Sequence, residues 1–151
     1  MSVAGAVLLD TDTLSELSRG NPTVNARARA YLTEFGRLTI SAVTVFERLR
    51  GYKDALRAGK QLQRQLLAFE ALVENSVVLP FDDEAADIAA TIWSACTRRQ
   101  RQQLGDILIA AIAAARQIPL ATRNLRDFDA LGKIPGVELD LVDWTKSGRN
   151  R

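Results

Sequence analysis

The stretch GDILIAAIAAA, residues 105–115, is the longest apolar run in the chain, and it carries a carboxylate, Asp106, near its start. A helix that is apolar on every side is normally buried, so this stretch predicts a helix at the centre of the molecule. The carboxylate at its mouth must be capped, paired or bound to a metal, because an isolated buried charge is very costly. The chain contains no histidine. Any metal site must therefore use mainly oxygen ligands, and any acid–base chemistry must use carboxylates or metal-bound water.

Length and composition indicate one globular domain. The 151 residues are 47% hydrophobic and 25% charged, which is ordinary for a chain that buries a core. Most of the 20 basic residues are arginine, and this mildly favours partners that contain phosphate. Cys96 is the only cysteine, which excludes an internal disulfide and fits a reduced, cytoplasmic setting. We expect no secretion signal and no membrane-spanning segment.

Short apolar runs alternate with helical patterns along the chain. The expected strands are residues 6–9, 37–41, 77–79 and 119–122, with a short edge strand at 137–141. The expected helices are residues 11–18, 24–32, 42–50 (closed by Gly51), 56–74, a helix capped by Asp82 that runs to Ala95, and the buried helix; a polar, basic stretch covers residues 97–103. This alternation predicts an α/β fold with a mainly parallel sheet of four to five strands. Residues 1–145 are expected to form the domain and residues 146–151 a flexible C-terminal tail.

Acidic residues follow or face the ends of several of these strands. Asp10 ends the first strand, Glu47 lies on the helix after the second, and Asn124 and Asp127 follow the fourth. Sites in open α/β sheets form beyond the carboxyl ends of the strands, so these side chains are expected to meet Asp106 at one edge. Carboxylates held together repel, and a divalent cation removes that penalty. Oxygen-only ligands favour Mg²⁺ or Mn²⁺ over zinc, and such a site can hydrolyse phosphodiesters.

Each of these residues also has a simpler interpretation. Asp10 and Asp106 could each cap a helix, because Asp is a preferred N-cap, and Asp127 could cap a turn. Asp12 is better explained as a cap, or as support for a ligand, than as a ligand itself. Glu47 alone is typical of a solvated helix position, and an arginine run such as residues 98–101 is usually a solvated face. Only the joint pattern favours a metal site.

The motifs resemble those of the PIN-domain family, in particular the VapC-type toxins of bacterial toxin–antitoxin pairs. The match runs in order through LLDTDTLSEL (8–17), LTISAVTVFERLRG (38–51), VLPFD (78–82), GDILIAA (105–111), ATRNLRDF (121–128) and VDW (142–144). The resemblance implies a three-layer α/β/α fold in which Asp10, Glu47 and Asp106 are the metal-binding, catalytic acids. Many relatives carry a further acid where this chain has Asn124. The fourth ligand is therefore either Asn124, through its amide oxygen, or Asp127.

The resemblance also implies an activity and partners. It implies a Mg²⁺-dependent endoribonuclease, with Mn²⁺ as a substitute, that arrests growth by cutting tRNA or ribosomal RNA. A VapB-type antitoxin would hold it in check, in a hetero-oligomer built on a toxin homodimer. The expected helices 24–32 and 56–74 could form the walls of a groove that binds the antitoxin, or they could simply pack in the core. Thr11 and Thr122 are placed to hydrogen-bond a ligand oxygen or a metal-bound water, and four arginines could hold RNA phosphates: Arg98, Arg99, Arg101 and Arg123.

Two other functions compete with this one. LLDTDTL (8–14) also resembles the Asp-x-Asp-x-Thr motif of haloacid-dehalogenase-type phosphatases, in which Asp10 would attack phosphorus. That family needs an acid four residues after Asp106, where this chain has Ala110, and a lysine, which is missing from residues 61–132. The other candidate is a catalytically weak PIN-like module that only binds RNA or its partner, and Asn124 is its best support.

Overall fold

A computed structural model of the chain describes residues 5–146, so most of the predicted flexible tail lies outside the described residues. Its centre is a five-stranded sheet in the order β3-β2-β1-β4-β5, and every neighbouring pair is parallel. The strands are β1 (Leu8–Leu9), β2 (Thr39–Ser41), β3 (Val77–Leu79), β4 (Leu120–Ala121) and β5 (Leu141–Val142). The predicted α/β fold with a parallel sheet is confirmed.

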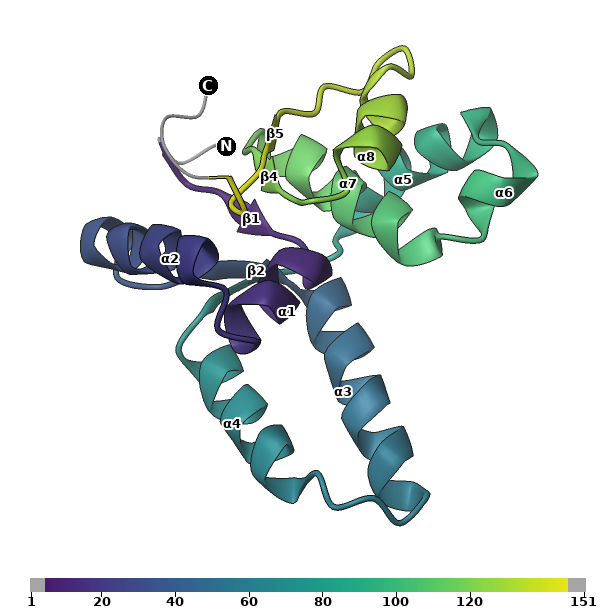
Figure 1. Cartoon of the computed structure of the whole chain (residues 1–151). Coiled ribbons are helices and arrows are strands. Elements are labelled where there is room, and N and C mark those ends of the chain that lie inside the picture. The colour runs from purple at the N-terminus through teal and green to yellow at the C-terminus, as the bar shows by residue number, and fades with distance from the viewer. Residues whose placement is uncertain (1–4, 147–151) are drawn as a thin grey trace.

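Eight helices flank this sheet within residues 5–146 (Figure 1). They are α1 (Thr11–Ser18), α2 (Pro22–Phe35), α3 (Ala42–Arg57), α4 (Gln63–Glu74), α5 (Asp83–Ala95), α6 (Arg98–Arg101), α7 (Leu104–Arg116) and α8 (Leu125–Gly132). Successive side chains of a strand point to opposite faces. Accordingly, Leu8 packs in the core formed with α5, α7 and α8, and Leu9 packs in a second core formed with α1, α2 and α4. The three-layer α/β/α arrangement is confirmed.

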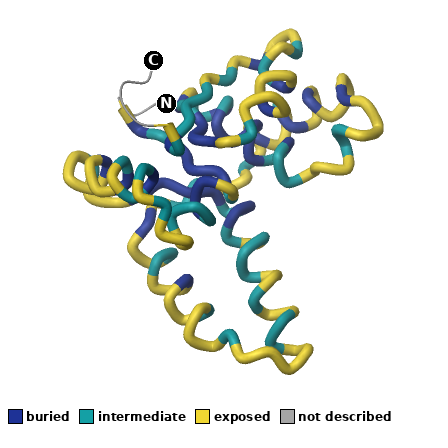
Figure 2. The backbone as a smooth tube through the Cα atoms, viewed as in Figure 1, coloured by how far each residue is buried: buried dark blue, intermediate teal, exposed yellow. Residues whose placement is uncertain are grey.

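Helix α7 is the buried helix that its sequence predicts. Seven of its residues are buried, among them Ile107, Ala110 and Ile112, and the helix packs along α5. Figure 2 shows much of this helix and the central strands β1, β2 and β4 in the colour of buried residues, whereas much of α2, α3 and α4 is exposed. The helix with the most buried residues among those within residues 5–146 therefore carries Asp106 in its first turn.

The helices after the second strand differ from the prediction. Gly51 does not end a helix, because α3 continues to Arg57. A glycine inside a helix costs only about 1 kcal/mol, and Tyr52 packs its ring 5.8 Å from that of Phe69. The expected single helix 56–74 is wrong as well: the chain turns after α3, where Gly59 has a φ of +89°, and α4 begins at Gln63. The result is a helical hairpin, α3 and α4, that projects from the sheet (Figure 1).

Smaller corrections concern the ends of elements. Helix α2 is longer than the expected 24–32. It begins at Pro22, because Asn21 Oδ1 accepts hydrogen bonds from the first free backbone N–H groups, and it ends at Phe35, before Gly36 with its φ of +82°. The expected edge strand at 137–141 is wrong in position, since β5 is Leu141–Val142. Helices α6 and α8 were not predicted. No helix within residues 5–146 is both long and apolar enough to span a membrane.

Candidate functional site

The order of the strands places a crevice at the end of β1. From β1 the chain adds β2 and β3 on one side, and later β4 and β5 on the other. Such a reversal leaves an opening beyond the carboxyl end of the central strand, where ligands bind in open α/β sheets. Asp10 directly follows β1 at this point, and its backbone N–H donates to the carbonyl oxygen of Ala121.

Asp10 combines a structural task with a buried carboxylate. It is only 4% exposed, and its Oδ1 accepts a 2.7 Å hydrogen bond from the backbone N–H of Thr13, so it is the N-cap of α1. Burial raises the pKa of Asp10, while hydrogen bonds from Thr122 and Thr13 oppose that rise. The capping interpretation of Asp10 is therefore confirmed, and it leaves the same carboxylate fixed at the mouth of the crevice.

Glu47 is held in place by two threonines. The hydroxyl of Thr11 donates to Glu47 Oε1 over 2.6 Å and lies 2.9 Å from the hydroxyl of Thr44. On its other side, the carboxylate lies against Gly105: a Cβ added there would overlap Oε2 and come within 3.1 Å of the carboxyl carbon. The absence of a side chain at Gly105 thus allows Glu47, from α3, to approach the first turn of α7.

Asp106 carries the strongest electrostatic signal of the site. Desolvation and the charges of Asp10, Glu47, Asp12 and Asp127, in that order, raise its pKa from 3.8 to about 6. It is not an N-cap, because the cap position of α7 belongs to Gln103. The helix-cap interpretation of Asp106 is therefore wrong. Its pKa is raised first by burial and then by the nearby carboxylates.

One cavity brings these acids together. Its lining residues come from four separate parts of the chain: Asp10, Thr11, Asp12, Glu47, Arg50, Asp106, Asn124 and Phe128. Within residues 5–146, however, no three acidic, cysteine or histidine side chains converge tightly enough to form a ready-made group of metal ligands. The acids therefore line a common cavity, but their side chains are not close enough together to form a complete set of metal ligands.

Asn124 and Asp127 lie next to each other, but they line different cavities. Asn124 lines the cavity shared by Asp10, Glu47 and Asp106, while Asp127 lines an adjoining cavity that shares only Asp106 with the first. The Asn124 amide donates a 3.2 Å hydrogen bond to Asp127 Oδ2, and the backbone N–H of Asn124 donates to Thr122 Oγ1. Thr122 therefore anchors the turn that carries Asn124.

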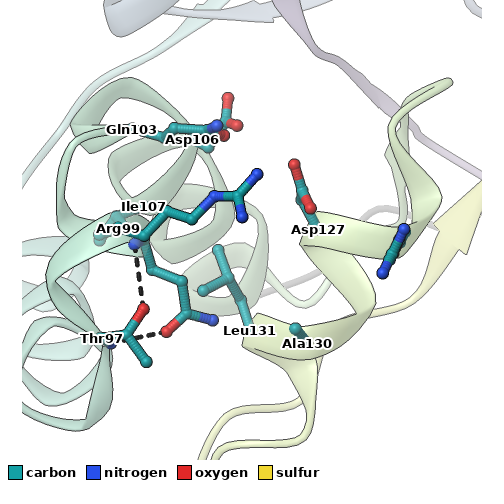
Figure 3. Close-up of a pocket in the computed structure, with 10 residues that line it drawn as sticks. Thr97, Arg99, Gln103, Asp106, Ile107, Asp127, Ala130 and Leu131 are labelled. Atoms are coloured by element: carbon teal, nitrogen blue, oxygen red, sulfur yellow. Dashed lines mark hydrogen bonds between the residues drawn. The ribbon is translucent and has the colours of Figure 1, made fainter.

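The four predicted phosphate-binding arginines do not lie together. Arg99 lines the adjoining cavity, where it extends toward Asp106 and Asp127 (Figure 3). Arg101 instead stacks 4.8 Å from the ring centre of Trp93 and donates to its backbone carbonyl. Arg123 forms an ion pair of 3.1 Å with Glu16, and Arg98 does not line either cavity.

Three side chains at the site were missed. Arg50 lines the cavity that Asp10, Glu47 and Asp106 share, and its guanidinium lies 5.2 Å from the ring centre of Phe46. Phe128, which is buried, closes one wall, and Arg126 lines the adjoining cavity. Arg50 could have been found, because it follows Glu47 by three residues and so shares its helix face. Arg126 and Phe128 could not, because α8 was not predicted.

Comparison with known proteins finds a matching family, similar sequences and similar solved structures. A family model described as "PIN domain" matches residues 7–134. The chain is 30% identical over 139 residues to the tRNA(fMet)-specific endonuclease VapC of Salmonella typhimurium, covering 91% of this chain and 96% of the relative. It is 26% identical over 141 residues to ribonuclease VapC1 of Haemophilus influenzae, covering 92% and 98%. Among solved structures, DNA-bound VapBC from Salmonella typhimurium matches with a TM-score of 0.70 and 26% identity, covering 92% and 98%.

Proposed function

This chain belongs to the PIN domain family, and we propose on that premise that it is a VapC-type, Mg²⁺-dependent endoribonuclease acting as the toxin of a toxin–antitoxin pair. The observation that carries the proposal is the shared cavity, which is lined by Asp10 after β1, Glu47 of α3 and Asp106 of α7. The rise in the pKa of Asp106 supports it, because neighbouring acids contribute to that rise. The relatives named above are ribonucleases and endonucleases.

The donor set fits a hard divalent cation. The atoms with which Asp10, Glu47, Asp106 and Asn124 can bind a metal at this cavity are oxygens, and Mg²⁺ prefers one or two carboxylates together with several waters. Because no three acids converge tightly within residues 5–146, we propose that part of the coordination passes through water. When bound, Mg²⁺ would lower the pKa of a water molecule and neutralise charge that develops on the phosphate.

The protein's own residues would position the acids and the substrate. Thr11 holds Glu47 by a hydrogen bond to one carboxylate oxygen, and the backbone of Thr13 holds Asp10. The buried ring of Phe128 keeps water away from one wall of the cavity. Arg50 opens onto the same cavity, where its guanidinium could bind the RNA phosphate bidentately.

Between the two candidates for a fourth ligand, we propose Asn124. It lines the cavity of the three acids, and Asp127 does not. Asp127 instead accepts the Asn124 amide N–H, an interaction that would turn the amide oxygen toward the cavity. Mg²⁺ binding measured by calorimetry should weaken more in Asn124→Ala than in Asp127→Ala, and the reverse order would assign the position to Asp127.

The relatives suggest the substrate and the partner. The Salmonella relative is named for tRNA(fMet), so we propose tRNA as the first substrate class to test. The solved relatives include VapBC complexes, and we propose a VapB-type antitoxin, a homodimer of this chain and a cytoplasmic location. Leu67 of α4 is 65% exposed while its neighbour Phe69 is buried. The α3–α4 hairpin therefore offers apolar surface to such a partner as well as to the core.

The competing functions differ in what they require of the site. A haloacid-dehalogenase-type phosphatase needs an acid where this chain has Ala110, and Ala110 is fully buried in the core. A module that only binds RNA needs no ordered carboxylates, whereas here Thr11 and Thr13 fix two of them. In both respects, the site favours the nuclease function over the competing one.

The test is cleavage of purified tRNA and ribosomal RNA by the purified chain across a Mg²⁺ titration, with the RNA ends sequenced. Asp10→Asn, Glu47→Gln and Asp106→Asn should each abolish cleavage while leaving the circular dichroism spectrum unchanged. Asp87→Asn removes an exposed acid from α5 and serves as the matched control, which should cleave like the wild type. Cleavage that survives in Asp106→Asn, or that is absent from the wild type with Mg²⁺ and with Mn²⁺, would overturn the proposal.

A further inference from the structure

A second cavity adjoins the catalytic one, between α6, the start of α7 and α8 (Figure 3). It shares Asp106 with the catalytic cavity. Ile107, Ala130 and Leu131 supply apolar surface to it, and two arginines from different helices, Arg99 of α6 and Arg126 of α8, supply positive charge. A strand of RNA whose scissile phosphate lies at Asp106 would therefore bring a neighbouring phosphate to this cavity.

The two arginines are not engaged by other charged groups. Among the ion pairs of residues 5–146, neither Arg99 nor Arg126 has a carboxylate partner. By contrast, Arg123 pairs with Glu16, and Arg116 pairs with Asp82. Arg99 extends toward the space between Asp106 and Asp127 (Figure 3).

The short helix that carries Arg99 is anchored at both ends. At its start, Thr97 and Gln100 form a reciprocal pair of hydrogen bonds of 2.7 and 3.2 Å between side chain and backbone. At its end, Arg101 stacks on Trp93 and donates to its carbonyl oxygen. These contacts orient α6, so Arg99 is presented to the cavity by a fixed backbone.

We propose that this cavity is a phosphate clamp, in which Arg99 and Arg126 bind the phosphate adjacent to the one that is cut. The proposal rests on the nuclease function and extends it. Guanidinium groups bind phosphate oxygens bidentately. The two arginines bring a charge of +2 to a cavity whose carboxylates are Asp106, which would hold the metal, and Asp127. One oxygen of that carboxylate already accepts the Asn124 amide N–H. Since the clamp contacts only the backbone, it contributes affinity and strand direction, and sequence choice lies elsewhere.

The clamp is tested by the salt dependence of RNA binding. A short, fluorescein-labelled single-stranded RNA of mixed sequence is titrated with the full chain by fluorescence anisotropy, in the Asp106→Asn background so that the RNA stays intact. Each phosphate contact contributes about 0.7 to the slope of log Kd against log salt for a single strand. Arg99→Gln and Arg126→Gln should each lower the slope by about that amount and weaken binding severalfold at low salt.

Two matched sets of variants separate a clamp from general attraction. Arg57→Gln and Arg64→Gln make the same charge change at exposed positions of the α3–α4 hairpin and should leave the slope near the parental value. Arg99→Lys and Arg126→Lys retain the charge without the guanidinium fork, and should recover only part of the affinity. All variants should retain the parental circular dichroism spectrum, because neither arginine is buried.

The possible results are distinct. Equal slopes for the cavity and hairpin variants, or full recovery by lysine, would overturn the clamp while cleavage by the wild type still supports the nuclease. A change in self-association by sedimentation, with RNA binding unaltered, would assign the cavity to contact between copies and also overturn it. A wild-type chain that neither binds nor cleaves RNA would refute the nuclease and the clamp together.

Discussion

Replacing Asp106 by asparagine should stabilise the metal-free protein at neutral pH while abolishing its activity. The pKa of Asp106 is raised from 3.8 to about 6 in the folded protein, first by desolvation and then by neighbouring acids. At about 1.4 kcal/mol for each pKa unit, ionised Asp106 costs roughly 3 kcal/mol of folding free energy. The side chain is only partly buried, so solvent screening reduces the expected gain in Asp106→Asn to about 1–2 kcal/mol.

The sign and the pH window follow from linkage. A carboxylate whose folded pKa lies above its unfolded value stabilises the fold fully below the unfolded pKa, and that stability is lost as pH rises through the folded pKa. Asp106 therefore imposes no cost on the folded state below about pH 3.8, and the cost of its ionised form grows as the pH rises and is complete above about pH 6. The advantage of Asp106→Asn should accordingly be absent near pH 4 and complete above pH 7.

Urea denaturation in EDTA, repeated from pH 4 to pH 8, measures this difference as the free energy of unfolding. Asp87→Asn, at an exposed position of α5, is the control and should show no such growth with pH. Adding Mg²⁺ at pH 8 should stabilise the wild type more than Asp106→Asn, because binding to the folded state alone stabilises it. A variant that is less stable than the wild type at pH 8, or a gain that does not change with pH, would refute the electrostatic account of Asp106.

Three other substitutions probe the supports of the site and the core. Gly105→Ala should raise or preserve the melting temperature, because alanine favours a helix more than glycine does. It should nevertheless lower the initial rate of RNA cleavage by about 100-fold, because the added Cβ displaces the Glu47 carboxylate. Thr11→Val should lower that rate about tenfold by removing the hydrogen bond to Glu47, and Thr11→Ser should restore it; equal rates in both would exclude this positioning role. Ile112→Ala should cost about 2–5 kcal/mol in urea denaturation, since Ile112 is fully buried in α7, and a smaller loss would mean that the core closes around the gap.

The parts of the fold that the sequence predicts are those in which local pattern and tertiary packing agree. The apolar run at residues 105–115 and the strands β1, β2 and β4 are buried in the structure as expected, whereas β3 and β5 at the sheet edges are not. The predicted end of α3 and the predicted start of α4 were wrong, whereas Glu74 ends α4 as expected. Gly51 is only a weak local signal for a helix end. The packing of Tyr52 on Phe69 outweighs it, and that contact joins two helices whose relation no periodicity reveals.

The acidic residues of the site could be located from the sequence, whereas the arginines could not, and the reason is geometric. Asp10, Glu47 and Asp106 each stand within a few residues of a strand end or of the buried helix, so topology alone brings them to one cavity. Arginine side chains are long, and their targets depend on neighbours that the chain supplies from elsewhere. Arg101 stacks on Trp93 and Arg123 pairs with Glu16, which leaves Arg99 together with the unpredicted Arg126 at the cavity beside Asp106. A count of basic residues thus indicates a phosphate-rich partner, but only the packing of α6 and α8 decides which arginines can hold its phosphates.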